Sequence, residues 1–374
     1  MGTGTGRKAV VVGGGIGGLA AAIGLHRTGW EVTVLERAAV LDDAGAGISL
    51  AANGIRALDA LGVGGAVRDA ARRQYTGGTR TPDGAWLSRM DGAALERALG
   101  IPMTGIPRAE LHRLLREALP PSCLRTGVGT LADGDGADLL VAADGVRSGI
   151  RGELFPEHPG PVHSGSTVLR AITAEPVELD TDFELTWGPG AEFGHIGFAD
   201  GRAEWHAVLS SPPGVRHADP LSVLRARFGG WHHPIPALLA ATRPGDVLHH
   251  DVSELVAPLP SYAVGRVALL GDAAHAMTPN LGQGACQALE DAVVLAAELA
   301  AGPSVEAALS RYDAVRRPRA SAVARAARRA GRLGHRLSHP VAVRARNAAL
   351  RLAPSGATIR AILTHASWTP PPLP

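Results

Sequence analysis

The spacing of hydrophobic residues changes along the chain, and each change predicts a different layer of the fold. Residues 8–36 pass from a β-branched apolar run to a helix of small residues and back to an apolar strand. This strand–helix–strand order is typical of a parallel sheet covered by helices. Helical spacing recurs at 53–61, 108–119 and 284–301, and a further apolar strand is expected at 267–270.

Residues 162–256 have a second pattern, in which short alternating strands are separated by turns. Examples are 167–172, 183–187 and 202–209, and such alternation favours an antiparallel sheet. We therefore expect an α/β protein in which a nucleotide-binding domain receives a mixed or antiparallel second domain and ends in helices. The predicted boundaries are 1–72, 105–160 and 257–319 for the nucleotide domain, 73–104 and 161–256 for the inserted substrate domain, and 320–374 for a C-terminal helical segment.

The first glycine-rich stretch predicts a dinucleotide site. Gly13, Gly15 and Gly18 form G-x-G-x-x-G between the first strand and its helix. The first glycine permits the tight turn, the second lets a pyrophosphate approach the backbone, and the third allows close helix–strand packing. Glu36 ends the second strand at the spacing of a carboxylate that binds a ribose hydroxyl. A signal peptide is the competing interpretation, but it explains neither the glycines nor Glu36.

Composition excludes several classes of function and site. The formal net charge is +2, the hydrophobic content is 45%, and Cys123 and Cys286 are the only cysteines. We expect no disulfide framework, no metal site, no nucleic-acid partner and no membrane span. Lys8 is the only lysine, so chemistry that needs an interior lysine is excluded. The arginine-rich stretch 311–360 is interpreted as a solvated helical face whose alanine and valine positions pack inward.

Two further motifs carry a family resemblance. Residues 139–148 hold an apolar strand followed by Asp144-Gly145, and residues 269–284 run from Gly271-Asp272 to Gly282-Gln283-Gly284. With the first motif, they make the chain resemble the single-component FAD-dependent aromatic hydroxylases, the para-hydroxybenzoate hydroxylase-like monooxygenases. The closest likeness is to the short salicylate, urate and hydroxynicotinate hydroxylases. The resemblance spans residues 8 to about 319 and implies a Rossmann-like FAD-binding domain.

The resemblance also implies roles for individual residues. Gly13, Gly15 and Gly18 would hold the FAD pyrophosphate, Glu36 the adenosine ribose, and Arg37 would lie beside the adenine. The residues implied at the flavin end are Ser49 in the loop near the movable ring, Arg108 at the ribityl phosphate, Asp144 toward FAD and the nicotinamide donor, Asp272 at the ribityl chain, Pro279 over the reactive edge, and Gly282, Gln283 and Gly284 at the pyrimidine end.

The implied reaction uses NADH or NADPH, O2 and a flavin C4a-hydroperoxide to hydroxylate a small aromatic substrate. No motif identifies the base that would deprotonate this substrate. By their place in the inserted sheet, five residues are candidates to line the substrate pocket: Arg170, Trp187, His195, Trp205 and His206. Pro279, His195 and Arg170 are the expected catalytic residues.

A flavin-dependent epoxidase of an alkene and a redox-inactive flavin-binding accessory protein remain alternatives to the hydroxylase. A halogenase is excluded because its catalytic lysine is missing. We expect a cytoplasmic protein for which a homodimer is possible. The segment 129–137 is shorter than the family's β-hairpin, which makes contacts to the adenine uncertain.

Overall fold

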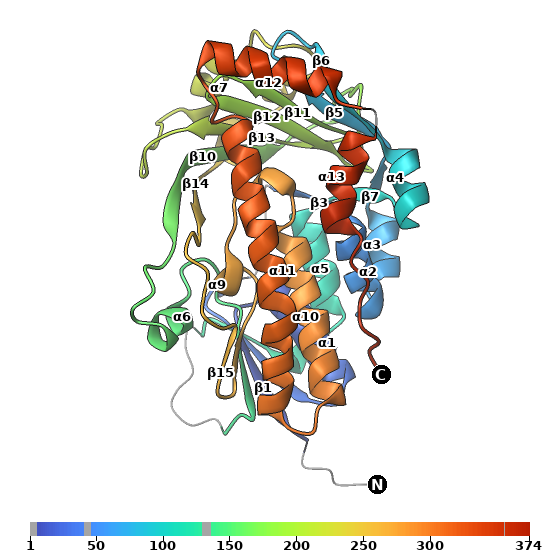
Figure 1. The fold of residues 1–374 in the computed structure, drawn as a ribbon, viewed down its shortest axis with the longest axis vertical. Helices are drawn as coiled ribbons and strands as arrows, with labels where there is room; N and C mark the ends of the chain where they lie inside the picture. The colour runs from blue at the N-terminus through green and yellow to red at the C-terminus, as the bar shows by residue number, and fades with distance from the viewer. Residues whose placement is uncertain (1–5, 41–45, 129–135, 355) are drawn as a thin grey trace.

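The computed structural model describes residues 6–40, 46–128, 136–354 and 356–374. It stacks a lower six-stranded sheet and an upper seven-stranded sheet, with long helices running beside both (Figure 1). The shortened segment 129–137 lies largely outside the described residues, so its effect on the adenine side stays a prediction. Within the described part of the chain, no helix is both long and apolar enough to cross a membrane.

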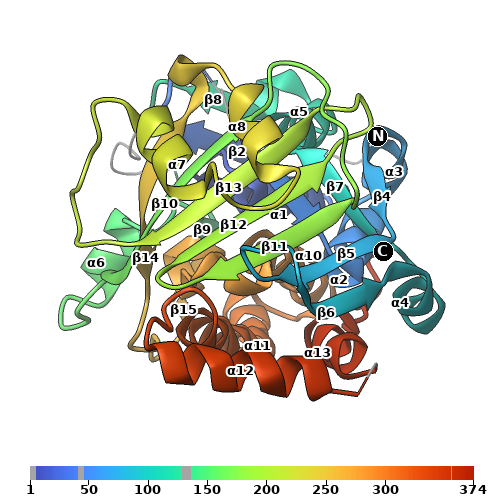
Figure 2. The same ribbon diagram turned by 90° about the horizontal axis from the view of Figure 1, so that it is seen from above.

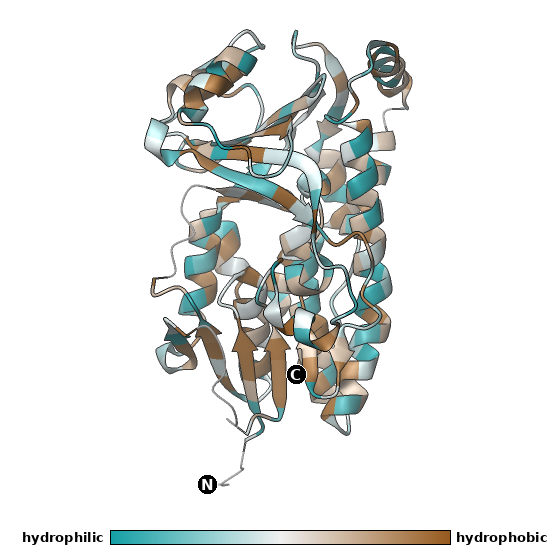
Figure 3. Ribbon diagram, turned by 90° about the vertical axis from the view of Figure 1, so that its left-hand side faces the viewer, coloured by the Kyte–Doolittle hydropathy of each residue, from teal (hydrophilic) through white to brown (hydrophobic). Residues whose placement is uncertain are grey.

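The six-stranded sheet is parallel apart from one edge strand. Its strands in spatial order are β15 (Ala263–Val264), β16 (Val267–Leu269), β9 (Leu139–Ala142), β1 (Lys8–Val12), β2 (Glu31–Glu36) and β8 (Leu124–Thr126). Val11 lies opposite Val34 on one side and Val141 on the other, and all three are fully buried. Helices cover both faces of such a sheet, so its strands are continuous apolar runs, as the hydropathy colouring of Figure 3 shows.

Helices from both ends of the chain pack beside this sheet. α1 (Ile16–Arg27) lies against α10 (Gly284–Ala301), which in turn packs on α11 (Val305–Leu333). The contact of α1 with α10 is close, because a Cβ on Gly24 would come within 2.8 Å of the Ala296 Cβ. The other helices are α2 (Ala52–Ala60), α3 (Gly64–Ala70), α4 (Gly92–Leu99), α5 (Arg108–Glu117), α6 (Gly149–Leu154), α7 (Pro220–Phe228), α8 (Ile235–Ala240), α9 (Asp272–His275), α12 (Pro340–Leu352) and α13 (Ala357–Ala366), with 3-10 turns η1 (Pro121–Cys123), η2 (Pro244–Asp246) and η3 (Pro279–Leu281).

The seven-stranded sheet is mixed. Its order is β14 (Leu248–Glu254), β10 (Val162–Ile172), β13 (Ala203–Ser210), β12 (Ala191–Gly197), β11 (Phe183–Gly188), β5 (Thr76–Arg80) and β6 (Trp86–Asp91). The strands are antiparallel except for the β11–β5 pair. Seen from above, α7 and α8 cross one face of this sheet (Figure 2). That face carries a separate apolar core, which includes Phe193, Trp205 and Phe228.

A small antiparallel sheet of β3 (Gly47–Leu50), β7 (Met103–Pro107) and β4 (Arg72–Gln74) lies beside the two large ones. The expected α/β class, the parallel sheet and the inserted mixed sheet are therefore confirmed. The helices expected at 53–61, 108–119 and 284–301 are present within two residues of those bounds. The domain boundaries drawn from the sequence stay a prediction.

Candidate active site

The glycine turn after β1 is built so tightly that side chains are excluded from two of its positions. Gly13 has φ +110°, and a Cβ there would lie 2.2 Å from the Ala143 carbonyl oxygen. A Cβ on Gly18 would lie 1.9 Å from the Gly13 carbonyl oxygen. Gly15 is different, because its missing side chain faces open space. The turn thus fixes β1, β9 and α1 together and leaves an open approach at Gly15.

The N-terminus of α1 has the properties of an anion site. Gly15 is its N-cap, no side chain caps it, and its first turn holds no acidic residue. Unpaired N–H groups and the helix dipole at such an end attract phosphate. Glu36 lies beside it at the end of β2, where its carboxylate accepts from the Gly14 and Ala38 N–H groups, both at 2.8 Å. Arg37 follows on the surface.

The second motif places a carboxylate next to this turn. Asp144 follows β9, and its Oδ2 accepts from the Ile150 N–H at 3.3 Å. Its Oδ1 is buried and has no hydrogen-bond partner among the described residues. A buried carboxylate oxygen needs a donor, so this atom fits a bound ligand. Arg151 joins the second motif to the third by donating to the Ala273 carbonyl at 3.0 Å.

The third motif presents a second open helix end. Gln283 is the N-cap of α10, and no side chain caps that helix. Gly282, with φ +61°, turns the chain from η3 into it. Asp272 and Pro279 are both exposed, Asp272 at the start of α9 and Pro279 at the start of η3. The backbone N–H groups of the α10 end are available to a group that gains negative charge.

A buried polar network lies directly behind this motif. Arg316, on α11, donates to Asp291 Oδ1 at 2.7 Å and also binds Glu290, and all three side chains are fully buried. Asp291 Oδ2 in turn accepts from the Gly271 N–H at 2.9 Å and contacts His275 Nε2 at 2.6 Å. Burial acts to raise the pKa of Asp291, but the charges of His275 and Arg316 hold it well below its usual range.

The same network reaches the N-cap of α10. Asn53, on α2, donates to Gln283 Oε1 at 2.9 Å and to Glu290 Oε1 at 2.7 Å. Sequence reasoning did not single out Asn53 or Arg316. The interpretation of 311–360 as a solvated face is wrong for Arg316, because that side chain is fully buried. An adjacent Glu290-Asp291 pair in a helix of small apolar residues was the signal that a buried cation must lie opposite.

The small sheet connects the nucleotide motifs with the upper sheet. Ser49, on β3, lies opposite Gly105, and its hydroxyl contacts the Gln74 side chain at 3.0 to 3.2 Å. Arg108 begins α5 just beyond β7 and donates its N–H to the Ala46 carbonyl at 2.9 Å. A Cβ on Gly47 would lie 2.6 Å from the Glu204 Cβ. The face of the seven-stranded sheet that bears Glu204 therefore faces the nucleotide motifs, and we call it the inner face.

The inner face carries charged residues. Arg170 and Gly194 both lie opposite His206 in the strand register, so all three share this face with Glu204. His206 Nδ1 is 3.3 Å from Glu204 Oε2. Burial lowers the pKa of His206, but the charge of Glu204 and their hydrogen bond outweigh burial and raise it above 6.5. Arg170, a sequence candidate, thus lies on the face that is turned toward the nucleotide motifs.

The other candidate from this sheet, His195, lies on the opposite, outer face. His195 pairs with Trp205, which is fully buried in the core under α7 and α8. Its Nε2 is 3.2 Å from the Thr181 carbonyl oxygen, and burial lowers its pKa to about 4. The reason is the two-residue repeat of a strand, which directs His195 away from the face that bears Glu192 and Glu204. The structure does not bring His195 to the site, and we no longer count it as a catalytic candidate.

Comparisons with known proteins agree with this arrangement. A family model described as an FAD binding domain matches residues 7–132 and 128–327. Aurachin C monooxygenase/isomerase of Stigmatella aurantiaca is 39% identical over 348 residues, which cover 88% of this chain and 90% of that protein. The 2-heptyl-3-hydroxy-4(1H)-quinolone synthase of Pseudomonas aeruginosa is 33% identical over 383 residues, or 94% of this chain and 95% of that protein.

Solved structures agree as well. Klebsiella pneumoniae HpxO complexed with FAD and uric acid is similar with a TM-score of 0.88 at 27% identity, over 96% of each chain. The glycine turn, the unpartnered Asp144 oxygen and the two uncapped helix ends fit the same cofactor. The chain therefore belongs to the FAD-binding domain family, and it is an FAD-dependent monooxygenase of the aromatic hydroxylase type.

Proposed function

We propose that this enzyme uses NAD(P)H and O2 to hydroxylate a nitrogen-containing aromatic ring that carries O–H or N–H groups and no carboxylate group. The observation that carries the proposal is the chemistry of the inner face, where Glu192 and Glu204 accompany His206 and Arg170. Carboxylates accept hydrogen bonds from ring N–H and O–H groups, and they repel a substrate carboxylate. A benzoate-type anion is therefore disfavoured beside them.

Two of the compared proteins support this substrate class, whereas relatives that are 34% to 38% identical are named for 3-amino-4-hydroxybenzoate, so the benzoates are the decisive contrast in the test. One is named for a 4-quinolone and a solved neighbour is complexed with uric acid, and both of these compounds are nitrogen heteroaromatics. In this proposal the substrate lies between the inner face and the flavin. Gly194 contributes by having no side chain, because a Cβ there would lie 2.4 Å from His206 Nε2. The ring of His206 therefore has room to lie beside Glu204.

We assign the cofactor to the residues expected from sequence. Gly13, Gly15 and Gly18 and the α1 end hold the pyrophosphate, and Glu36 and Arg37 lie on the adenosine side. The residues at the flavin end are Ser49, Arg108, Asp144, Asp272, Pro279, Gly282, Gln283 and Gly284. Bound FAD supplies the redox chemistry, accepting a hydride from NAD(P)H and activating O2. The chain itself positions the ring, excludes water and stabilises charge.

The test is aerobic consumption of NADH and NADPH by the FAD-loaded protein with a panel of aromatic compounds, followed by mass detection. The panel pairs 4-hydroxyquinoline, uric acid and xanthine with salicylate and 4-hydroxybenzoate. We expect a heteroaromatic compound to accelerate NAD(P)H loss and to gain one oxygen atom. Acceleration by the benzoates alone would overturn the substrate class. Hydrogen peroxide as the sole product with every compound would contradict hydroxylation by this site.

Glu204→Gln is the matched variant for this panel. It keeps the size and hydrogen-bonding capacity of the side chain and removes its charge. We expect weaker turnover of the heteroaromatic substrate and a smaller difference from the benzoates, because the repulsion of anions is reduced. Thr186→Ser, on the outer face of the same sheet, is the control and should leave the preference unchanged. The homodimer and the cytoplasmic location stay predictions.

A further inference from the structure

The outer side of α12 exposes an apolar stripe to solvent. Its members follow one another at intervals of three or four residues and lie on one face of the helix: Val341, Ala345, Ala348 and Leu352. Val341 is 66% exposed and Leu352 is 84% exposed, so a large apolar side chain faces solvent at each end of the stripe. Single exposed apolar residues are normal on a protein surface. A contiguous stripe indicates a surface that another molecule covers.

Arginines flank this stripe along one edge. Arg344 and Arg351 are exposed and lie seven residues apart, which is two turns of the helix. Arg351 interacts electrostatically with Asp83, whereas Arg344 forms no ion pair within the described residues. An apolar stripe bordered by arginines is typical of helices that lie in the plane of a membrane surface. The 13 residues of α12 include three arginines, so this helix is too short and too charged to cross a membrane.

Charge is divided unequally along the chain. Residues 314–374 hold twelve arginines and no aspartate or glutamate. Because the formal net charge of the whole chain is only +2, residues 1–313 carry a net negative charge. The helices α11, α12 and α13, which contain most of the positive segment, lie along one side of the molecule (Figure 2). An anionic surface attracts this side and repels the remainder, so it orients the protein with α12 toward itself.

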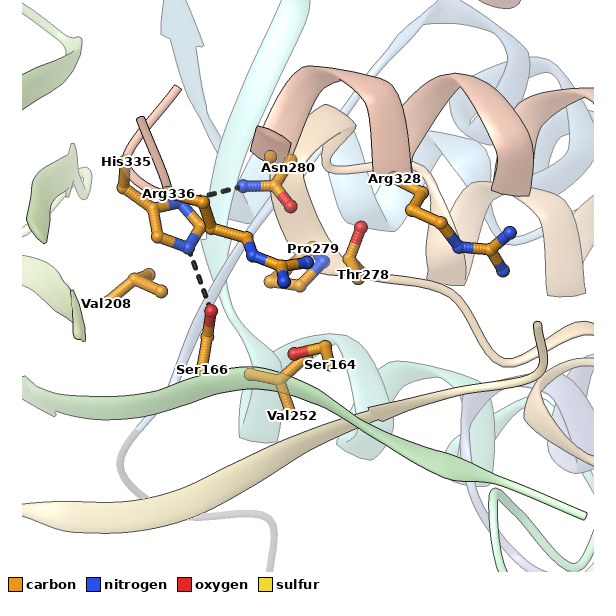
Figure 4. A pocket seen from close by; sticks show the side chains of 11 residues that line it. Ser164, Ser166, Val208, Val252, Thr278, Pro279, Asn280, Arg328, His335 and Arg336 are labelled. Carbon is orange, nitrogen blue, oxygen red and sulfur yellow. Dashed lines mark hydrogen bonds between the residues drawn. The ribbon is translucent and has the colours of Figure 1, made fainter. Parts of the chain in front are cut away.

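The inner side of α12 holds the helix in place, which keeps its outer side turned to solvent. Arg346 donates to the Gly334 carbonyl oxygen at 2.8 Å, and its guanidinium lies 5.2 Å from the centroid of the Trp187 ring. The turn before α12 is fixed as well, because His335 is only 2% exposed and its Nε2 is 3.0 Å from the Ser166 hydroxyl oxygen (Figure 4). α12 also packs on β6 and is therefore attached to the sheet that bears the proposed substrate site.

Two other occupants fit this surface less well than a membrane. In a two-fold dimer the same patch meets itself, so Arg344 and Arg351 would face arginines, and α12 holds no acidic residue to compensate them. A nucleic acid would pair with the arginines but would leave Val341 and Leu352 beside polar phosphates, and the stripe has no aromatic residue on which a base stacks. A bilayer with anionic headgroups accommodates both kinds of side chain.

We propose that α12 is a peripheral membrane-docking helix. Arg344 and Arg351 bind anionic lipid headgroups, while Val341 and Leu352 enter the apolar layer beneath them. The association is reversible, because one short helix buries little apolar area. The proposal goes beyond the proposed function and holds whichever ring the enzyme hydroxylates. Docking would keep the enzyme at a surface in which apolar aromatic compounds accumulate.

Sedimentation of FAD-loaded protein with lipid vesicles tests the proposal. One set of vesicles is made of phosphatidylcholine alone, and the other holds equal parts of phosphatidylcholine and phosphatidylglycerol. We expect wild type to bind the anionic vesicles only, and salt to weaken this binding because it screens the arginines. Absence of binding to the anionic vesicles, or equal binding to both kinds, would overturn the proposal.

Two double variants separate the apolar contribution from the charged one. Val341→Ser with Leu352→Ser removes the large apolar side chains, and Arg344→Gln with Arg351→Gln removes the charges. We expect each pair to weaken binding to anionic vesicles about tenfold or more. Binding that the apolar pair leaves unchanged would indicate a general affinity for polyanions such as nucleic acid and would overturn membrane docking. A dimer that the apolar pair dissociates would identify a second copy as the occupant, with the same consequence.

The matched control is Val40→Ser with Arg125→Gln. Val40 is 74% exposed, and Arg125 is an exposed residue of β8, which lies on the opposite side of the molecule from α12 (Figure 2). This pair should bind vesicles as wild type does. An equal loss of binding in the control would overturn the assignment to α12. Flavin absorbance and the unfolding midpoint establish that each variant retains FAD and its fold.

A second readout needs no loss of binding. Cys123 and Cys286 are buried, so Leu352→Cys provides an exposed cysteine that can be labelled selectively with an environment-sensitive dye. With anionic vesicles, we expect the dye emission to shift to shorter wavelength, because position 352 enters the apolar layer. The same dye on Val40→Cys should not shift. A dye at position 352 that remains in water while the protein sediments with vesicles would overturn the proposal.

Discussion

The two faces of the seven-stranded sheet use the same strands and differ in chemistry. On the outer face, Phe193 stacks on Trp205 with ring centroids 5.6 Å apart, and both residues are buried under α7 and α8. On the inner face, Arg170, Glu204 and His206 lie toward the nucleotide motifs. The outer face holds the sheet and its helices together, whereas the inner face supplies the polar groups of the proposed substrate site.

In this sheet, a shift of one residue along a strand decides whether a side chain packs in the apolar core or faces the nucleotide motifs. His195 and His206 are both histidines of adjacent strands, yet they point in opposite directions. Because the side-chain repeat of a strand is two, a shift of one residue exchanges the faces. The environment then determines the charge state: burial lowers the pKa of His195 to about 4, whereas Glu204 raises the pKa of His206.

The largest effect on stability is expected from Trp205→Ala. Trp205 is fully buried, and its indole N–H donates to the Thr242 hydroxyl at 2.7 Å. Removing a buried aromatic side chain costs about 3–5 kcal/mol, measured by urea unfolding. Trp187→Ala, on the inner face, is the comparison and should cost less because that ring is half-buried. Equal losses would contradict the division between the faces.

The next effect is a pH dependence of stability from His195. Its pKa in the folded protein, about 4, lies below the ordinary value of 6.5. The unfolded chain therefore binds more protons between these values, so this contribution is fully present above pH 6.5 and is lost as pH falls toward 4. The loss is about 3 kcal/mol. The unfolding free energy of wild type should fall more steeply from pH 7 to pH 4 than that of His195→Gln. Parallel curves for the two proteins would contradict the prediction.

A smaller stability effect but a clear effect on binding is expected from His206→Asn. We expect the unfolding free energy to fall by under about 1 kcal/mol. We expect KM to rise about tenfold, because the substrate loses a hydrogen bond to the charged imidazole of His206. The raised pKa means that His206 is protonated below that value and loses its charge as pH rises through it. The KM of wild type should therefore rise with pH, and that rise should be missing from the variant. A variant with the wild-type profile would remove His206 from the site.

The smallest effect is expected from Gly194→Ala. The added Cβ would lie 2.4 Å from His206 Nε2 and 2.8 Å from Leu185 Cδ2, both at the far ends of side chains that can turn aside. The fold should be little affected, within about 0.5 kcal/mol, while KM rises severalfold because His206 is displaced. Thermal unfolding and steady-state kinetics measure the two quantities. A fall in stability with unchanged KM would reverse the assignment of this position to the inner face.

The nucleotide half of the fold was predictable because its chemistry is local. Gly13, Gly15, Gly18 and Glu36 lie within a single strand–turn–helix–strand unit, where turn geometry and helix dipole dictate the residue types. The face of a strand in the inserted sheet was less predictable. A bulge in β10 between His163 and Thr167 shifts the register, and neither hydropathy nor residue type distinguishes His195 from His206.

The partners in contacts between distant segments could not be identified from the sequence, even where a buried charge indicated that a partner must exist. Asn53 binds Glu290 across 237 positions of the chain, and a polar residue at the start of a helix gives no indication of such a partner. Arg316 is one of thirteen arginines between residues 311 and 360, most of which resemble solvated residues of a helix. Only the packing of α11 on α10 selects Arg316 as the cation that compensates two buried carboxylates.

The network behind the third motif has a consequence for synthesis of the chain. Arg319 binds Glu290 and also donates to the His365 carbonyl at 2.9 Å, so the support of the motif extends to the last helix. Contacts between such distant segments form late and slow folding. The glycine turn at residues 13–18 is synthesised long before Arg316, Arg319 and His365, so the support of the third motif is still missing when the turn emerges. We therefore expect a nascent chain released before residue 316 to be unable to retain FAD, and the flavin to enter only after α11 has been synthesised.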